Sequence, residues 1–256
     1  MDTTRRDFLR AAGFTVVGAG TVVSALAGAS SEEVSGEGGP RWAMVVDLKK
    51  CQKDAGCNRC REACHSRHNV PDLEDPRHEI KWIWKAPFEH VFPGHVGEYY
   101  DPKLKDLPTV VMCNHCDNPP CVRVCPTRAT FRRADGVVVM DPHRCIGCRY
   151  CIVGCPYGSR SFNFVDPWPD RNPPNKDYPT RMRGVVEKCT LCPERIAAGE
   201  VPYCVEACEK AGIGALTFGD IADPNSAVRK LVESSGRTIL RRKPELGTRP
   251  QVYYLL

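Results

Sequence analysis

The chain has 256 residues, enough for one large domain or two small ones. Its formal net charge of +5 is mild and its basic residues are spread along the chain, so the charge does not point to nucleic-acid binding. The unusual feature is the content of 16 cysteines, which indicates bound metal or clusters that replace part of the hydrophobic core.

The first thirty residues have the features of an export signal. Arg5 and Arg6 lie in a segment, Thr4–Arg10, that matches the twin-arginine pattern S/T-R-R-x-F-L-K apart from its last residue. We therefore predict a twin-arginine signal over residues 1–30 and a polar, Gly-rich linker over residues 31–41. This route exports folded proteins, so the thiols would be occupied before they meet an oxidising compartment. An ordinary basic signal or a retained membrane anchor is the alternative interpretation.

A short β-branched run leads into each of four cysteine-rich segments. These strand-like runs lie at residues 43–50, 109–113, 136–145 and 183–189. An Asp-Gly turn predicts a β-hairpin over residues 130–141. The Cys-x2-Cys-x2-Cys-x3-Cys-Pro segments are too short for long helices and fit a loop with one helical turn. Together these features predict an α+β fold of short strands and helices with many loops.

Two segments between the cysteine groups have a different character. Residues 72–108 form an aromatic insert, in which Trp82 and Trp84 either contact a partner or pack internally. Residues 166–180 are Pro-rich and are expected to be irregular.

The C-terminal segment, residues 221–256, is expected to hold one helix and a strand-like tail. Asp223 and Pro224 have the pattern of an N-cap followed by proline at the first helical position. Outside the first thirty residues, no run of the chain reaches the roughly 18 apolar residues of a spanning helix.

The sixteen cysteines form four groups of four. The third group, C-x2-C-x2-C-x3-C-P at residues 145–156, matches the bacterial ferredoxin run, in which three cysteines bind one [4Fe–4S] cube and the fourth reaches its neighbour. With four thiolates per cube, the sequence predicts four [4Fe–4S] clusters. The predicted iron ligands are Cys51, Cys57, Cys60, Cys64, Cys113, Cys116, Cys121, Cys125, Cys145, Cys148, Cys151, Cys155, Cys189, Cys192, Cys204 and Cys208.

Two other uses of the cysteines fit their spacing poorly. Disulfide frameworks spread their cysteines to join distant segments, whereas many of these cysteines are only three residues apart. Structural zinc prefers two Cys-x2-Cys pairs separated by a finger or ribbon. The sequence has no Cys-x-x-Cys-His haem motif and no catalytic constellation that we can identify, so no catalytic residue is predicted.

Four histidines lie close to the cysteine groups. His115, inside the second group, either ligates a cluster or donates a hydrogen bond to sulfur, and ligation is not expected where four cysteines are present. His65, His68 and His143 are expected to be polar surface residues.

These groups, with x4 spacing in the second and x11 in the fourth, resemble the four-cluster ferredoxin-like iron–sulfur subunits of dimethyl sulfoxide and polysulfide reductases. Four stretches, WIWKAPFEHVFPG, VVMCNHCDNPPCVRVCPTRATF, HRCIGCRYCIVGCPYGSRSFNF and RRKPELGTRPQVYYL, are more specifically similar to one branch. That branch is the exported iron–sulfur subunit of the Dsr membrane complex (DsrO type) and of the heterodisulfide-reductase-like menaquinol oxidoreductase. The resemblance covers residues 41–256.

The resemblance also implies how the cysteines are shared, because in that family groups one and four form one two-cluster unit and groups two and three form an inserted one. The first unit would hold one cube on Cys51, Cys57, Cys60 and Cys208, and another on Cys189, Cys192, Cys204 and Cys64. The inserted unit would hold one cube on Cys113, Cys116, Cys121 and Cys155, and another on Cys145, Cys148, Cys151 and Cys125. The x5 spacing after Cys51 departs from the usual x2.

The same resemblance divides the chain into nested units. The outer ferredoxin-like unit would comprise residues 42–71 and 181–220, and the inner unit residues 109–165. The aromatic insert, the Pro-rich loop and the C-terminal helix and tail would lie outside both units.

The resemblance implies an electron-transfer subunit rather than a catalytic chain by itself. It would pass electrons between an integral membrane quinone-interacting subunit and a c-type cytochrome, in a menaquinol-linked complex of sulfur or sulfate metabolism. The complex would lie on the periplasmic face of the cytoplasmic membrane, and this chain would bind neither a small-molecule substrate nor nucleic acid.

Three alternatives stay open. The chain could relay electrons for a molybdopterin oxidoreductase of the polysulfide, thiosulfate or dimethyl sulfoxide reductase type. It could be a self-contained reductase with an open iron site in the first cysteine group. It could also be a structural metal-binding scaffold, which would contain zinc and show no visible absorption.

Overall fold

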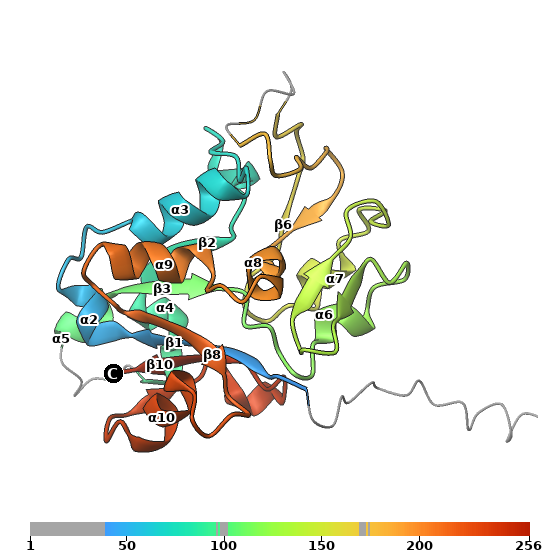
Figure 1. Ribbon diagram of the computed structural model, residues 1–256. Coiled ribbons are helices and arrows are strands. Elements are labelled where there is room, and N and C mark those ends of the chain that lie inside the picture. Colours follow the sequence, from blue (N-terminus) through green and yellow to red (C-terminus); the bar gives the residue numbers. More distant parts are fainter. Residues whose placement is uncertain (1–38, 96, 98–101, 169–172, 174) are drawn as a thin grey trace, which may run out of the picture. The chain divides into compact units, whose positions relative to one another are not determined.

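A four-stranded sheet pairs the first strand of the described chain with the last. Its order is β8–β1–β10–β9, formed by β8 (Leu216–Asp220), β1 (Trp42–Asp47), β10 (Val252–Leu255) and β9 (Ile239–Leu240) (Figure 1). Strand β1 runs parallel to β10, with Val45 opposite Tyr253, and the other neighbours are antiparallel. The predicted C-terminal strand is therefore confirmed, and it lies inside the sheet.

The computed structural model describes residues 39–95, 97, 102–168, 173 and 175–256. The predicted signal at residues 1–30, and the linker up to residue 38, lie outside the described residues. Within the described part, no helix is long and apolar enough to cross a bilayer.

Both faces of this sheet are buried, because β1 has apolar side chains at successive positions. Met44 enters the large core, whereas Val45, which points to the opposite face, packs with Val228 of α10 (Ala227–Ser234) in a smaller core. The sheet therefore separates helix α10 from the part of the molecule that carries most of the cysteines.

Helix α10 starts later than the sequence predicted. Ser226 is its N-cap, since the Ser226 hydroxyl accepts a hydrogen bond from the backbone N–H of Arg229 at 3.1 Å. The carboxylate of Asp223 instead accepts from the backbone N–H two residues further on, in the preceding turn. The predicted cap at Asp223 and Pro224 is therefore wrong, because both residues precede the cap.

Cysteine groups one and four are carried largely by four short helices. The helices are α2 (Leu48–Gln52), α3 (Arg59–Arg67), α8 (Pro193–Ala197) and α9 (Tyr203–Lys210). Helices α3 and α9 lie side by side (Figure 1). The four-residue spacings Cys60–Cys64 and Cys204–Cys208 place two cysteines on one face of each helix.

The aromatic insert folds as an antiparallel hairpin with short helical turns. Its elements are η1 (Pro76–His78), β2 (Ile83–Pro87), α4 (Phe88–Val91), η2 (Pro93–His95), α5 (Pro102–Lys105) and β3 (Pro108–Met112). Strand β2 pairs with β3, placing Trp84 opposite Val111. Trp82 is buried and Trp84 is half-buried, and both pack with the large core. This favours internal packing over partner contact for Trp82.

Cysteine groups two and three lie on short turns beside a small hairpin. The elements are α6 (Pro120–Arg123), β4 (Thr130–Arg132), β5 (Val138–Met140), α7 (Tyr150–Val153), β6 (Ser161–Phe162) and β7 (Val186–Glu187), and η3 (Pro244–Leu246) follows near the C-terminus. The predicted hairpin is confirmed, because β4 pairs antiparallel with β5 and Gly136 in the turn has a φ of +81°. Strand β6 pairs with β7, which brings the chain after group three beside the chain before group four.

The fold is therefore α+β with short elements and small sheets, as the sequence predicted. The division into nested units stays a prediction.

Candidate iron–sulfur cluster sites

All sixteen cysteines lie in the described part of the chain, and each is a free thiol rather than half of a disulfide. This argues against the disulfide alternative. The cysteines gather into four sets, which we call A to D and define below by their members.

Set A combines three cysteines of group one with the last cysteine of group four. Burial, together with the neighbouring thiols of Cys51, Cys208 and Cys57, raises the pKa of the Cys60 thiol to about 12. The x5 spacing after Cys51 therefore does not keep these four sulfur atoms apart. Set A is Cys51, Cys57, Cys60 and Cys208.

Set B lines a small cavity where α3 approaches α9. Cys64 of α3 leaves the other cysteines of its own group and joins three cysteines of group four. Burial raises the pKa of Cys64 well above its ordinary value, and the three neighbouring thiols raise it further. Set B is Cys64, Cys189, Cys192 and Cys204.

Sets C and D line two further small cavities. In each set, three cysteines of one group are completed by the last cysteine of the other group. Set C is Cys113, Cys116, Cys121 and Cys155. Set D is Cys125, Cys145, Cys148 and Cys151.

The four sets follow one another in the order A, B, C, D. The Cys60 thiol of set A raises the pKa of Cys204 in set B, after the larger effects of burial and of the nearer thiols within set B. In the same way, the thiol of Cys113 in set C adds to the rise that burial causes in the pKa of Cys189 in set B. Burial raises the pKa of Cys151 in set D, and Cys121 of set C adds to this rise. Cysteines of neighbouring sets therefore lie close enough to affect one another's pKa.

The backbone of the cysteine loops adopts left-handed conformations that turn the chain around each set. Gly147 has a φ of +70°, and a Cβ there would lie 2.4 Å from the Gly184 carbonyl oxygen, so only glycine fits. Arg149, His115 and Leu191 have φ values of +62°, +41° and +64°. Such turns bring successive N–H groups toward one side of the loop, where they stabilise an anion.

These residues fit an iron–sulfur cluster chemically. Four thiolates packed together repel one another, and iron held between them supplies the compensating positive charge. Around set C, the described structure also contains buried polar atoms without hydrogen-bond partners, namely Arg160 Nη2 and both side-chain polar atoms of Asn114. Both residues line the set C cavity, where the sulfur atoms of a cluster would accept hydrogen bonds.

His115 lies next to set C and is buried. Its Nδ1 accepts a hydrogen bond from the backbone N–H of Val138 at 3.2 Å, which leaves Nε2 as the donor of the neutral imidazole. This arrangement fits the predicted sulfur hydrogen-bond donor better than a ligand.

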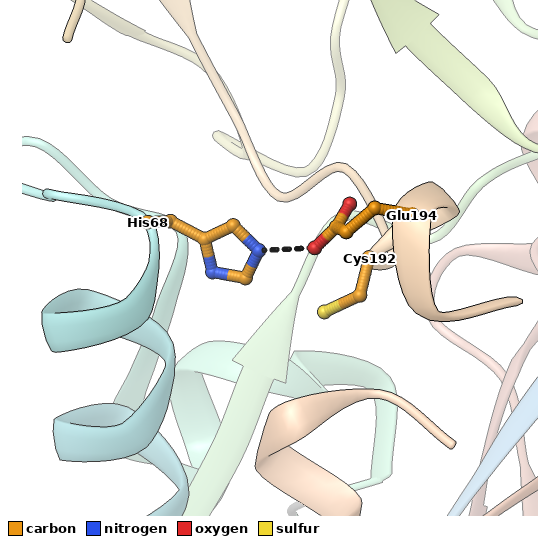
Figure 2. Close-up of side chains that lie close together, drawn as sticks. All are labelled: His68, Cys192 and Glu194. Atoms are coloured by element: carbon orange, nitrogen blue, oxygen red, sulfur yellow. Dashed lines mark hydrogen bonds and ion pairs between the residues drawn. The ribbon is translucent and has the colours of Figure 1, made fainter. Parts of the chain in front are cut away.

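A candidate mononuclear metal site, drawn in Figure 2, lies beside set B. The ligand atoms of His68, Cys192 and Glu194 lie within 4.8 Å of one another. Both imidazole nitrogens of His68 already have protein partners: Nε2 lies 3.2 Å from Glu194 Oε1, and Nδ1 lies 2.9 Å from the Cys64 carbonyl oxygen. Because Cys192 also lines the set B cavity, we interpret this trio as a hydrogen-bond network around set B rather than a separate metal site.

The expectation that His68 is a surface residue is wrong. His68 is 1% exposed and its ring packs against Trp82 and Tyr178. His143 is exposed, as expected, and His65 is half-buried.

Sequence reasoning also missed a buried ion pair beside set B. Glu187 accepts hydrogen bonds from Trp82 Nε1 at 2.9 Å, Asn163 Nδ2 at 2.6 Å and Arg181 Nη2 at 2.7 Å. The other arm of Arg181 donates to the backbone carbonyl of His68. The pair ties the segment before group four to the end of α3, and no motif marked it in the sequence.

Comparisons with known proteins agree with this geometry. A profile of the 4Fe-4S dicluster domain family matches residues 107–221, which contain cysteine groups two, three and four. Together with the α+β fold of short elements, this match defines the chain as a ferredoxin-like iron–sulfur protein.

The full-length relatives narrow the class further. "Hdr-like menaquinol oxidoreductase iron-sulfur subunit 1" of Archaeoglobus fulgidus is 43% identical over 84% of this chain and 82% of the relative. One subunit of the tetrathionate reductase of Salmonella typhimurium is 36% identical over 100% of this chain and 89% of the relative. "Menaquinone reductase, iron-sulfur cluster-binding subunit" of Nitratidesulfovibrio vulgaris is 37% identical over 84% of this chain and 88% of the relative. The chain therefore belongs to the family of iron–sulfur electron-transfer subunits of oxidoreductase complexes.

Proposed function

We propose that sets A, B, C and D each bind one [4Fe–4S] cluster, so that all sixteen cysteines are iron ligands. The observation that carries this proposal is that three small cavities are each lined by four cysteines, three from one group and one from another. When bound, such clusters accept and pass single electrons, and the surrounding residues set their potentials through burial, charge and hydrogen bonds to sulfur.

We further propose that the chain is a relay in a menaquinol-linked complex of sulfur or sulfate metabolism. It would connect an integral membrane quinone-interacting subunit with a c-type cytochrome. The linear order of the four sets supports a relay, and the similarity to the menaquinol oxidoreductase subunit of A. fulgidus supports the menaquinol-linked branch. No residue of the chain is proposed to bind a small-molecule substrate.

The place of action is part of the same proposal. The twin-arginine pattern at Thr4–Arg10 supports export with the clusters already inserted, and attachment to the outer face of the cytoplasmic membrane through partner subunits.

Set D offers a point of electron exchange at the molecular surface. Cys148 is exposed, and Ile146, Tyr150 and Val153 beside it are 67%, 64% and 87% exposed. The relay would thus end close to solvent, where a partner's redox group could come within reach.

The second candidate function is a relay for a molybdopterin catalytic subunit. The similarity to a tetrathionate reductase subunit over the whole chain favours it. Both functions use the same four clusters and differ in the partner at one end.

The experiment is anaerobic affinity purification of the full-length protein from native membranes, with an untagged strain as the control. We expect a quinone-interacting membrane subunit and a c-type cytochrome to co-purify, and a menaquinol analogue to bleach the visible cluster absorption. Co-purification of a molybdopterin subunit instead would move the chain to the second candidate. A protein that purifies alone and does not respond to menaquinol would contradict both.

A further inference from the structure

Three buried cations in the described part of the chain have no acidic partner; one is Arg242, and the other two, Arg160 and Lys188, lie between cysteine sets. Arg160 is 5% exposed and Lys188 is 2% exposed. In the described part of the chain, neither of these two side chains forms an ion pair with a carboxylate. A buried cation without a counter-ion costs several kcal/mol, so an anion must be close to each one.

Arg160 lies where set C meets set D. Its Nη1 donates to Thr130 Oγ1 at 3.0 Å, which fixes the guanidinium, and the side chain lines the set C cavity. Thr130 in turn lines the set D cavity, so the guanidinium lies between the two sets. The thiols whose charges act on it most strongly are Cys121 of set C and Cys151 of set D, followed by Cys113 of set C. Because arginine does not deprotonate in proteins, this site carries a permanent positive charge.

Lys188 lies where set B meets set C. Its ammonium group donates to the carbonyl oxygens of Val138 and Cys189, the latter at 2.6 Å. Val138 lines the set C cavity and Cys189 is a member of set B, so the ammonium group lies between the two sets.

The acidic residue next to Lys188 in the sequence does not neutralise it. The carboxylate of Glu187 is bound by Arg181, Asn163 and Trp82. The available anions near Lys188 are therefore the thiolates of sets B and C.

We propose that Arg160 and Lys188 are positioning residues that raise the reduction potentials of the clusters on either side of them. This inference rests on the proposed binding of four clusters. A cluster ligated by four thiolates is an anion, and reduction adds one more negative charge, so a fixed cation beside it favours the reduced form. Arg160 acts on the clusters of sets C and D, and Lys188 on those of sets B and C.

Set C is the one set that both cations reach, whereas set A is reached by neither. The cluster of set C should therefore respond to removal of either charge, those of sets B and D to one charge each, and that of set A to none. A general loss of structure would shift the potentials of all four clusters, so this set-by-set pattern distinguishes a local electrostatic effect from it.

The test is an anaerobic redox titration of the full-length protein, followed by electron paramagnetic resonance, for wild type, Arg160→Gln and Lys188→Met. We expect each variant to lower the equilibrium constant for reduction of its two flanking clusters at least tenfold. For a one-electron couple this is a fall of 59 mV in the reduction potential. The signals of sets C and D are assigned with Cys121→Ala and Cys125→Ala, and those of sets A and B with Cys57→Ala and Cys192→Ala. Lys85→Met is the matched control, because Lys85 is a cation near Cys51 of set A but its ammonium group is exposed.

A charge-preserving variant separates the electrostatic role from a structural one. Arg160→Lys should keep the potentials of sets C and D close to wild type, although it loses the planar fork that bonds Thr130. If Arg160→Gln fails to assemble all clusters, Lys188→Met and Arg160→Lys still decide the matter. Unchanged potentials in variants that hold all four clusters would overturn this inference and leave the proposed function standing. Fewer than four clusters in the wild type would instead refute the proposed function.

Discussion

We expect Cys125→Ala and Cys148→Ala to remove the same cluster, although these residues lie in different cysteine groups. Both line the set D cavity, so either change leaves that cluster with three thiolates. Each variant should lose up to about four iron atoms per chain, together with one signal in the spectrum of the reduced protein. The measurement is iron content with electron paramagnetic resonance on anaerobically purified protein.

The matched control is Cys121→Ala, four residues before Cys125. Cys121 lines the set C cavity, so its loss should remove a different signal from the one lost in Cys125→Ala. If Cys121→Ala and Cys125→Ala remove the same signal while Cys148→Ala removes another, the fourth ligands are not exchanged between groups and the assignment of sets C and D is wrong.

We expect Glu187→Gln to be the most destabilising single change outside the cysteines. Glu187 accepts hydrogen bonds from three buried donors, one of them the guanidinium of Arg181. The neutral amide leaves Arg181 buried without a counter-ion and presents an NH2 group to donors. Breaking a buried pair in this way costs about 3–5 kcal/mol. In a chain of this size the midpoint of thermal unfolding should fall on the order of 10 °C. The midpoint is measured by near-ultraviolet circular dichroism under anaerobic conditions.

Glu233→Gln is the control for this prediction. Glu233 pairs with Arg229 on α10, where both side chains are exposed, and such a pair contributes about 0.3–0.5 kcal/mol. A similar fall in the unfolding midpoint for both variants would mean that the Glu187 network is not a special determinant of stability.

The cysteine pattern predicted much of the site because cluster ligation is a local property of spacing. Three closely spaced thiols, as in residues 145–151, must converge on one object, so the sequence alone indicated clusters. The exchange of Cys64, Cys125, Cys155 and Cys208 between groups followed from a family resemblance, because spacing does not show which distant segment a fourth cysteine reaches.

The elements that depend on distant partners could not be predicted with the same detail. The strand-like character of the tail was visible, but its parallel pairing with β1 joins segments more than two hundred residues apart. Arg160 and Lys188 look like ordinary surface cations in the sequence, since their burial results from the packing of several short elements. The cap of α10 was placed three residues early because Asp223 and Ser226 are both good capping residues, and only the structure shows which one bonds the first turn.

The most direct test of the account is to count metal and sulfide in the full-length protein, purified anaerobically with its clusters intact. Four clusters require about sixteen iron atoms and about sixteen acid-labile sulfides per chain, with zinc absent and visible absorption that dithionite bleaches. A chain that carries zinc without visible absorption, or only about four to eight iron atoms when fully loaded, would contradict the account.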